Sequence, residues 1–204
     1  MEHSNETQKA SSPSNSMITG QCRCGCVTYE FPKAAGLDIN DKDMGELYRI
    51  LIIPPEKQKF PERGGNSNKW RANHCHCAAC TQTAGALVVS WAYIPLAHLK
   101  VNRKEKTGIY RASNHASREF CQICGSCLFF QEDGDKDGVD VTLATITTPN
   151  LFNHFEPANH TWLEDVADVV LDEHGKGGGF ATLCNDGLPR FKQSGQQSII
   201  STNK

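Results

Sequence analysis

The chain has 204 residues, of which 38% are hydrophobic and 22% charged, so we expect one domain, or two at most, with a packed core. Its net charge of -2 gives no reason to expect a nucleic acid or another polyanion as a partner. No apolar run reaches the roughly 18–20 residues needed to cross a bilayer, and no basic start followed by an apolar core indicates a secretory signal.

The N-terminal part begins with a polar stretch, residues 1–16, for which we expect a disordered tail because it cannot bury enough apolar surface to fold. A Cys-x-Cys unit follows at Cys22 and Cys24. Gly25 would let the backbone turn tightly beside a metal ion. Residues 27–31 then alternate between apolar and polar side chains, which predicts a half-buried strand.

Residues 33–69 form the least readable part of the chain. The run LYRILII at 47–53 predicts a buried strand, and two prolines directly after it would end that strand. The polar stretch 56–69 predicts a surface loop. We interpret the whole segment either as an insertion with no role in function or as a flap beside the functional site.

The motif CHCAAC at 75–80 places three thiols within six residues. Cys75 and Cys77 are two residues apart, so their side chains point the same way from extended backbone. A turn after them could return Cys80 to the same point. Three converging thiols suit zinc and leave one tetrahedral position open, which is the feature that separates a catalytic zinc from a structural one.

Further strands are predicted at 87–94, at 128–130 and at 139–146, with a short helical turn at 96–99 between the first two. The basic run 100–106 is typical of a solvated hairpin rather than of a nucleic-acid surface.

A Cys-x-x-Cys-Gly unit at Cys121, Cys124 and Gly125 is the usual knuckle of a structural zinc site, because the glycine admits close approach of the backbone to the thiolates. Residues 147–191 fit a helix and strands equally well. We expect a flexible C-terminal tail at 192–204.

Seven of the ten cysteines fall into local groups: Cys22 with Cys24, Cys121 with Cys124, and the triplet at 75–80. The economical arrangement is one closed four-thiolate zinc and one open three-thiolate zinc, so we expect two Zn²⁺ ions. Pairing of the first two thiols with the triplet is a rival arrangement. A disulfide framework is the other alternative, but the lack of a secretory signal favours metal and a cytoplasmic protein, with a nuclear location also compatible.

Three cysteines remain: Cys26, Cys127 and Cys184. We expect them to be packed free thiols, although any of them could supply a fourth ligand to the open zinc. His74 and His76 flank the triplet. His76 would point away from the neighbouring thiols in extended backbone, so we expect it near the metal but not bound to it.

Three motifs together resemble the family of glutathione-dependent formaldehyde-activating enzymes and centromere protein V. They are G-x-C-x-C-G-x-V-x-Y at 20–29, C-H-C-x-x-C with Gly-Ala at 75–86, and R-x-F-C-x-x-C-G-x-x-L at 118–128. Further matches are Asp140-Val-Thr-Leu, Trp162 and the segment 186–191. The resemblance covers residues 17–191, which we take as one domain containing the 33–69 insertion.

The resemblance implies a mainly β, Mss4-like fold of several short coiled antiparallel sheets held by zinc. It also implies a structural zinc and a second, substrate-side zinc. The structural ligands would be Cys22, Cys24, Cys121 and Cys124, and the substrate-side ligands would be Cys75, Cys77 and Cys80. The implied activity is that of a carbon–sulfur lyase like S-hydroxymethylglutathione synthase, acting on the adduct of a small carbonyl compound with glutathione or a similar thiol.

For the chemistry, we expect a substrate thiolate at the open zinc position and outer donors from His74, His76, Ser113 and Arg118. Arg118 could hold a substrate carboxylate as a bidentate fork, or it could form a structural salt bridge near the knuckle. Thr81 stands where the family often has arginine. The alternative function is a non-catalytic zinc module that binds a protein or chromatin partner, and a third possibility is a β scaffold with two structural zincs.

Overall fold

The computed structural model describes residues 16–36 and 68–165. Nearly all of the 1–16 tail and of the 33–69 insertion lie outside the described residues, as do the strand expected at 47–53 and the tail at 192–204. Cys184 and the motif at 186–191 also lie outside them. The domain boundaries drawn from the sequence therefore remain predictions.

The described residues form ten strands in two sheets, with short helices, and the expected mainly β class of short antiparallel sheets is confirmed. The smaller sheet has the order β1 (Met17–Gln21), β2 (Val27–Pro32), β5 (Lys100–Arg103). The larger sheet has the order β10 (Phe155–Thr161), β3 (Trp70–Cys75), β4 (Val89–Pro95), β9 (Gly138–Thr142), β8 (Cys127–Glu132), β7 (Ala116–Cys121), β6 (Thr107–Tyr110). The helices are α2 (Ala78–Ala84) and the 3-10 turns η1 (Ala34–Gly36), η4 (Leu143–Thr145), η5 (Leu151–Asn153) and η6 (Leu163–Asp165).

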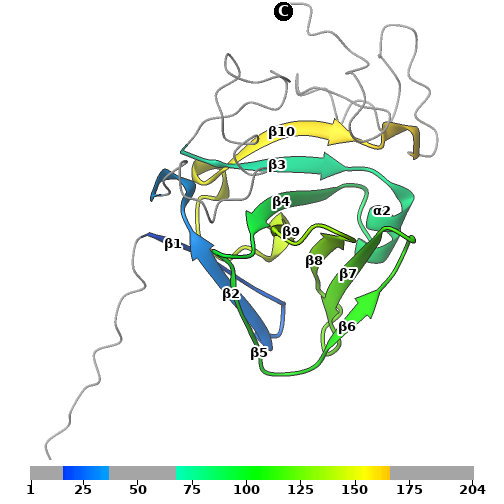
Figure 1. Ribbon diagram of the computed structural model, residues 1–204, viewed down its shortest axis with the longest axis horizontal. Coiled ribbons are helices and arrows are strands. Elements are labelled where there is room, and N and C mark those ends of the chain that lie inside the picture. Colours follow the sequence, from blue (N-terminus) through cyan, green and yellow to red (C-terminus); the bar gives the residue numbers. More distant parts are fainter. Residues whose placement is uncertain (1–15, 37–67, 166–204) are drawn as a thin grey trace, which may run out of the picture.

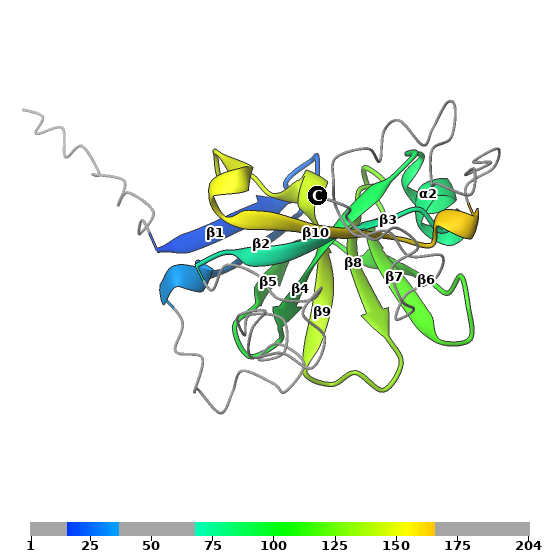
Figure 2. The same ribbon diagram turned by 90° about the horizontal axis from the view of Figure 1, so that it is seen from above.

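The larger sheet is strongly coiled. Figure 1 shows it curling from β10 and β3 through β4 and β9 to β6, with the smaller sheet beside it and α2 at the far end of β3. Figure 2, seen from above, shows β10 and β3 running together across the other strands. The pair β10–β3 is parallel, whereas every other pair of named strands is antiparallel.

The core between the sheets is aromatic. Phe31 of β2 meets Trp70 of β3 edge to face, with ring centroids 5.7 Å apart, and Phe155 of β10 with centroids 6.4 Å apart. The Trp70 indole N–H donates to the carbonyl of Pro32 at 3.0 Å, so its polar atom is satisfied. Rings of this size, buried at this density, are each worth about 3–5 kcal/mol against truncation to alanine.

Strands expected at 27–31, 87–94 and 128–130 are confirmed as β2, β4 and β8, and the turn after β4 is present. The strand expected at 139–146 is too long, because β9 ends at Thr142 and η4 follows. The hairpin expected at 100–106 is wrong. β5 pairs with β2 and β6 pairs with β7, so residues 104–106 connect the two sheets.

An ion pair also joins the two sheets. Arg103 of β5 donates from Nε and Nη2 to the two carboxylate oxygens of Glu119 on β7, at 2.6 and 2.8 Å. The guanidinium carbon lies 5.9 Å from the centre of the Phe129 ring. A two-pronged contact of this kind fixes geometry better than a single bond, so it aligns β5 against β7.

Glu119→Gln should therefore lower the free energy of unfolding by up to about 1 kcal/mol. The amide carries no charge and offers Arg103 one acceptor oxygen in place of two, while solvent already screens part of the pair. Urea unfolding at pH 7 would measure the change, and 1 M salt should shrink it. The exposed Glu105→Gln is the matched control and should change nothing. A Glu119→Gln protein as stable as the wild type would show that this pair does not hold the sheets.

Candidate active site and metal centres

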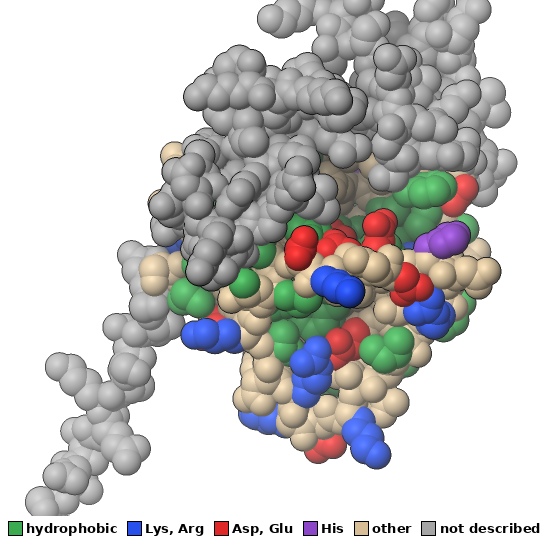
Figure 3. Space-filling model, viewed as in Figure 1, with side chains coloured by type: hydrophobic (Ala, Val, Ile, Leu, Met, Phe, Trp, Pro, Cys, Tyr) green, Lys and Arg blue, Asp and Glu red, His purple; other side chains and the backbone are tan. Residues whose placement is uncertain are grey.

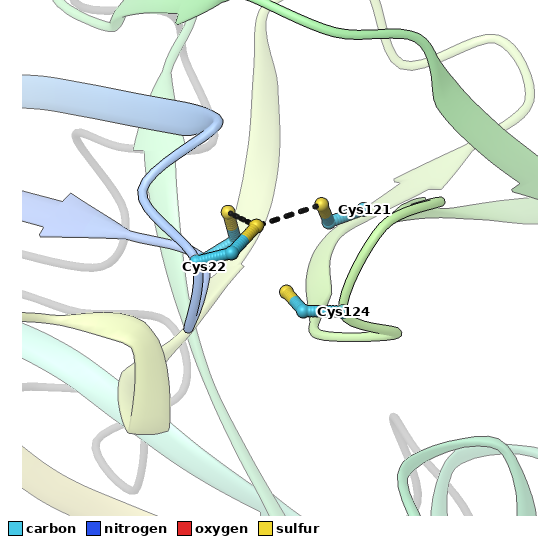
Figure 4. Close-up of side chains that lie close together, drawn as sticks. Cys22, Cys121 and Cys124 are labelled. Atoms are coloured by element: carbon cyan, nitrogen blue, oxygen red, sulfur yellow. Dashed lines mark hydrogen bonds between the residues drawn. The ribbon is translucent and has the colours of Figure 1, made fainter.

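Four thiols from two distant turns converge on one point. Cys22 and Cys24 come from the β1–β2 turn, and Cys121 and Cys124 from the β7–β8 turn; all four sulfurs lie within 4.8 Å of one another. Figure 4 shows the two turns facing each other with their sulfurs inward. The Cys22 and Cys24 sulfurs are 3.5 Å apart, and those of Cys24 and Cys121 are 3.7 Å apart. Four sulfurs at about 2.3 Å from a tetrahedral ion would be ~3.8 Å apart, so this four-thiol cluster fits a metal ion such as zinc.

The same local geometry builds both turns. The Gly25 N–H donates to the Cys22 carbonyl at 3.0 Å, and the Gly125 N–H donates to the Cys121 carbonyl at 2.8 Å. Both glycines have a positive φ, 74° and 73°, which a residue with a Cβ adopts only under strain. In addition, the Val27 N–H donates to the Cys22 sulfur at 3.2 Å, which favours the thiolate.

The alternatives for these thiols are now decided within the described residues. Cys22 and Cys24 meet the knuckle and not the triplet, so the rival pairing is wrong. All nine described cysteines are free thiols, and the sulfur separations in the four-thiol cluster far exceed a disulfide bond of about 2.05 Å.

The second cluster, the three-thiol cluster, consists of Cys75, Cys77 and Cys80, whose sulfurs also lie within 4.8 Å of one another. Cys75 ends β3, and Cys77 caps α2 from extended backbone, φ -60° and ψ 145°. The Cys80 backbone N–H donates to the Cys77 sulfur at 3.3 Å. The turn expected after Cys77 is thus the first turn of a helix, and it brings the Cys80 sulfur back to those of Cys75 and Cys77, as the spacing predicted.

The three sulfurs compete for protons. Hydrogen bonds from Cys75 and Cys77, joined by one from Arg118 Nη2 at 3.2 Å, lower the pKa of Cys80 far below its usual range. Hydrogen bonds to Cys77 and Cys80, together with burial, raise the pKa of Cys75 in turn. Two buried thiols, Cys75 and Cys80, and the half-buried Cys77 cannot all ionise beside a single guanidinium, and a bound divalent cation would supply the missing positive charge.

The three-thiol cluster opens into a pocket of about 400 Å³, a size that suits a small ligand. Trp91 and Phe130 form its apolar wall, with ring centroids 5.8 Å apart. The Arg118 guanidinium stacks 5.0 Å from the centre of the Phe130 ring. The buried Nε of Arg118 has no hydrogen-bond partner among the described residues. The pocket thus combines soft ligands, a cation with a spare donor and an apolar wall.

The two histidines of the sequence motif lie beside the cluster but outside its ligand set. Among the described residues, the cluster's group of metal-ligating atoms contains sulfurs only. His76 is buried, with its Nε2 2.8 Å from Nδ1 of His160, and His74 Nδ1 lies 2.8 Å from the Ser90 hydroxyl. His160 was missed from the sequence, because it lies on β10 in the ambiguous 147–191 region.

Some other residues around the pocket were expected from the sequence and some were not. Ser113 lines the pocket, so it lies where the outer donor expected from the sequence would be. Trp162 also lines it, at a positive φ of 61°, and Asp165 accepts a hydrogen bond from the Ala78 N–H at 3.2 Å. Asp165 gave no signal in the sequence. Cys127 packs against the three-thiol cluster without joining its ligand group, as expected for a packed free thiol.

Residues 65–165 match the family model for the glutathione-dependent formaldehyde-activating enzyme. Among solved structures, a crystal structure of a Rhodobacter sphaeroides protein shares 21% identity and covers 70% of this chain and 99% of its own, with a TM-score of 0.41. A comparison with curated proteins finds no match. Within the described residues, no helix has the length and apolar character that a membrane span requires.

Cys121→Ser should remove one metal ion per chain and most of the folding stability. Structural zinc binding contributes about 10–16 kcal/mol in small peptides, comparable with the stability of a whole domain, about 5–15 kcal/mol. Elemental analysis and thermal unfolding would measure both effects. Cys26→Ala is the matched control, because Cys26 lies in the facing β1–β2 turn but outside the ligand group, so this variant should keep its metal. Full metal content in Cys121→Ser would contradict the assignment.

Proposed function

We propose that the chain is a zinc-dependent carbon–sulfur lyase, because its residues 65–165 match the family model for the glutathione-dependent formaldehyde-activating enzyme. Its substrate would be the adduct of a small carbonyl compound, such as formaldehyde, with glutathione or a similar thiol. The observation that carries this proposal is the three-thiol cluster, which opens into a ligand-sized pocket with Arg118 beside it.

Two zinc ions per chain fit the thiols. Cys22, Cys24, Cys121 and Cys124 would hold a structural zinc with all four positions filled. The three-thiol cluster would hold a substrate-side zinc with one position left for an outside ligand. A zinc ion there would supply the positive charge that favours the thiolate form of a substrate thiol.

The residues of the chain would position and shield the reacting groups. Arg118 holds Cys80 through Nη2, and its buried Nε–H remains available to a substrate carboxylate. Trp91 and Phe130 keep water from the carbonyl compound. In the forward direction a bond forms between the substrate sulfur and the carbonyl carbon, and the carbonyl oxygen becomes a hydroxyl; the reverse direction releases thiol and aldehyde.

A non-catalytic module would need a fourth protein ligand to close the three-thiol cluster. Within the described residues that cluster holds three ligand atoms and no fourth. A chromatin partner would also call for a basic surface, whereas Figure 3 shows Lys and Arg mixed with Asp and Glu on the face in view. Both points favour the enzyme. The nine cysteines of the described residues form no disulfide, which suits a reducing compartment, and we propose the cytoplasm as the location.

Cys77→Ser tests the proposal directly. The variant should lose one zinc per chain and all measurable turnover while it keeps its fold, because the four-thiol cluster is untouched. Exchange NMR of formaldehyde with glutathione would follow turnover, with elemental analysis for zinc. Cys127→Ser, a thiol beside the cluster but outside its ligand group, is the matched control. Full activity in Cys77→Ser would end the proposal.

Arg118 should recognise the carboxylate of the thiol substrate. Arg118→Lys keeps the charge but loses the Nε–H, so the KM for glutathione should rise roughly 10-fold or more, as expected for a lost charged hydrogen bond. The KM for 2-mercaptoethanol, which has no carboxylate, should stay within about 2-fold if only carboxylate binding is lost. An equal rise for both thiols would show that Arg118 acts through Cys80 alone.

A further inference from the structure

The pocket contains an acidic side chain to which neither the metal clusters nor Arg118 gives a role. Asp140, on β9, lines the same pocket as the three-thiol cluster. Its register places it opposite Phe130 of β8 on one side and Tyr93 of β4 on the other, and Phe130 in turn is opposite Arg118 of β7. Directly opposed residues project from the same face of a sheet, so Arg118 and Asp140 flank Phe130. Two strand spacings put their backbones about 10 Å apart along one wall of the pocket, with the Phe130 side chain between them.

The sheet holds Asp140 firmly in this place. Val139 and Val141, its neighbours in β9, point the other way into the core. The Tyr93 ring packs so closely over Gly138 that a Cβ there would lie 2.1 Å from it. The Tyr93 hydroxyl donates to Asp135 at 3.2 Å, so it does not serve Asp140. No hydrogen bond to the Asp140 carboxyl occurs within residues 16–36 and 68–165, which leaves both oxygens for a ligand.

The charges around Asp140 favour its protonated form. Burial, and then the negative charges of Glu132 on β8 and of Asp135 in the turn after it, raise its pKa to about 7. The other titratable groups on the pocket wall are Arg118 on β7, His115 just before β7, Asp165 at the end of η6 and the thiols of the three-thiol cluster. A carboxyl that is half protonated near neutral pH can both accept and donate a proton, as a general acid–base catalyst must.

We propose that Asp140 is the general acid–base residue of this pocket and carries the one proton that passes from substrate sulfur to substrate oxygen. This role rests on the lyase function proposed above. The Asp140 carboxylate first accepts the S–H proton of the thiol. The sulfur electron pair then forms the C–S bond while the C=O π pair moves onto oxygen. The Asp140 O–H gives its proton to that oxygen, which restores the carboxylate. The net reaction is the addition of a thiol to an aldehyde, with no oxidant or reductant, and the reverse sequence releases them.

Asp140→Asn is the decisive variant, since the amide matches the carboxyl in shape but transfers no proton. We expect kcat to fall by about 10²–10⁴-fold, the usual contribution of a general acid–base residue, with zinc content unchanged. The pH dependence near 7 should disappear. In Glu132→Gln the pKa of Asp140 should fall, because one of the charges that raises it is gone, and the midpoint of the pH–rate profile should move to lower pH. The exposed Glu105→Gln is the matched control and should leave the profile unchanged.

A readout independent of turnover comes from NMR of protein labelled with ¹³C at the aspartate carboxyl. We expect one carboxyl signal of the zinc-loaded wild type to titrate near pH 7 and to be absent in Asp140→Asn. Wild-type rates in Asp140→Asn, or a signal for Asp140 that titrates at an ordinary carboxyl pKa of about 4, would overturn the proposal. A zinc-loaded wild type that turns over no thiol–aldehyde pair would refute the lyase function itself, and this role of Asp140 with it.

Discussion

The four-thiol cluster is the contact on which the rest of the fold depends. It joins turns whose cysteines lie 97 residues apart in the chain, Cys24 and Cys121. One turn closes the β1–β2 hairpin of the smaller sheet, and the other closes the β7–β8 hairpin of the larger sheet. Thiolates packed this closely repel one another, and a cation at their centre would offset that repulsion. A metal ion there would tie together two hairpins that also share the apolar core, where Tyr29 of β2 meets Phe129 of β8 edge to face with ring centroids 5.4 Å apart.

The three-thiol cluster uses the same ligands for a different purpose, and the difference lies in what surrounds them. In the four-thiol cluster, each pair of thiols lies in a turn that contains a glycine, and the two turns face each other. The three-thiol cluster sits where a strand gives way to a helix, and it faces a pocket. Arg118 of β7 donates a hydrogen bond to one of its sulfurs, that of Cys80. The difference between the two clusters therefore results from the local fold and from a neighbouring strand, and not from the number of cysteines in the chain.

Features of the fold and of the site could be predicted from the sequence where they depend on neighbouring residues, and could not where they depend on contacts between distant segments. Knuckles, glycine turns and alternating strands are local, and the sequence predicted them. The strand β10 has the sequence FEPANHT, with little alternation, and it forms by parallel pairing with β3, so nothing local signals it. The hairpin predicted for the basic run was wrong because β5 and β6 pair with β2 and β7, and both of these strands lie outside the run. Arg118 was expected to meet a substrate or a salt bridge, and its contact with Cys80 depends on the coil of the sheet.

The register of β9 sets the core and the pocket at the same time. Val139 and Val141 fill the core from one face, while Asp140 stands in the pocket on the other. A slip of one residue against β8 would put two valines in the pocket and a carboxyl in the core, which would cost several kcal/mol for the buried charge alone. The pairs that prevent the slip are Phe129 with Val141 and Phe130 with Asp140. The apolar packing that makes the fold stable therefore also holds an acidic group in the pocket of the three thiols, where no other described residue forms a hydrogen bond with it.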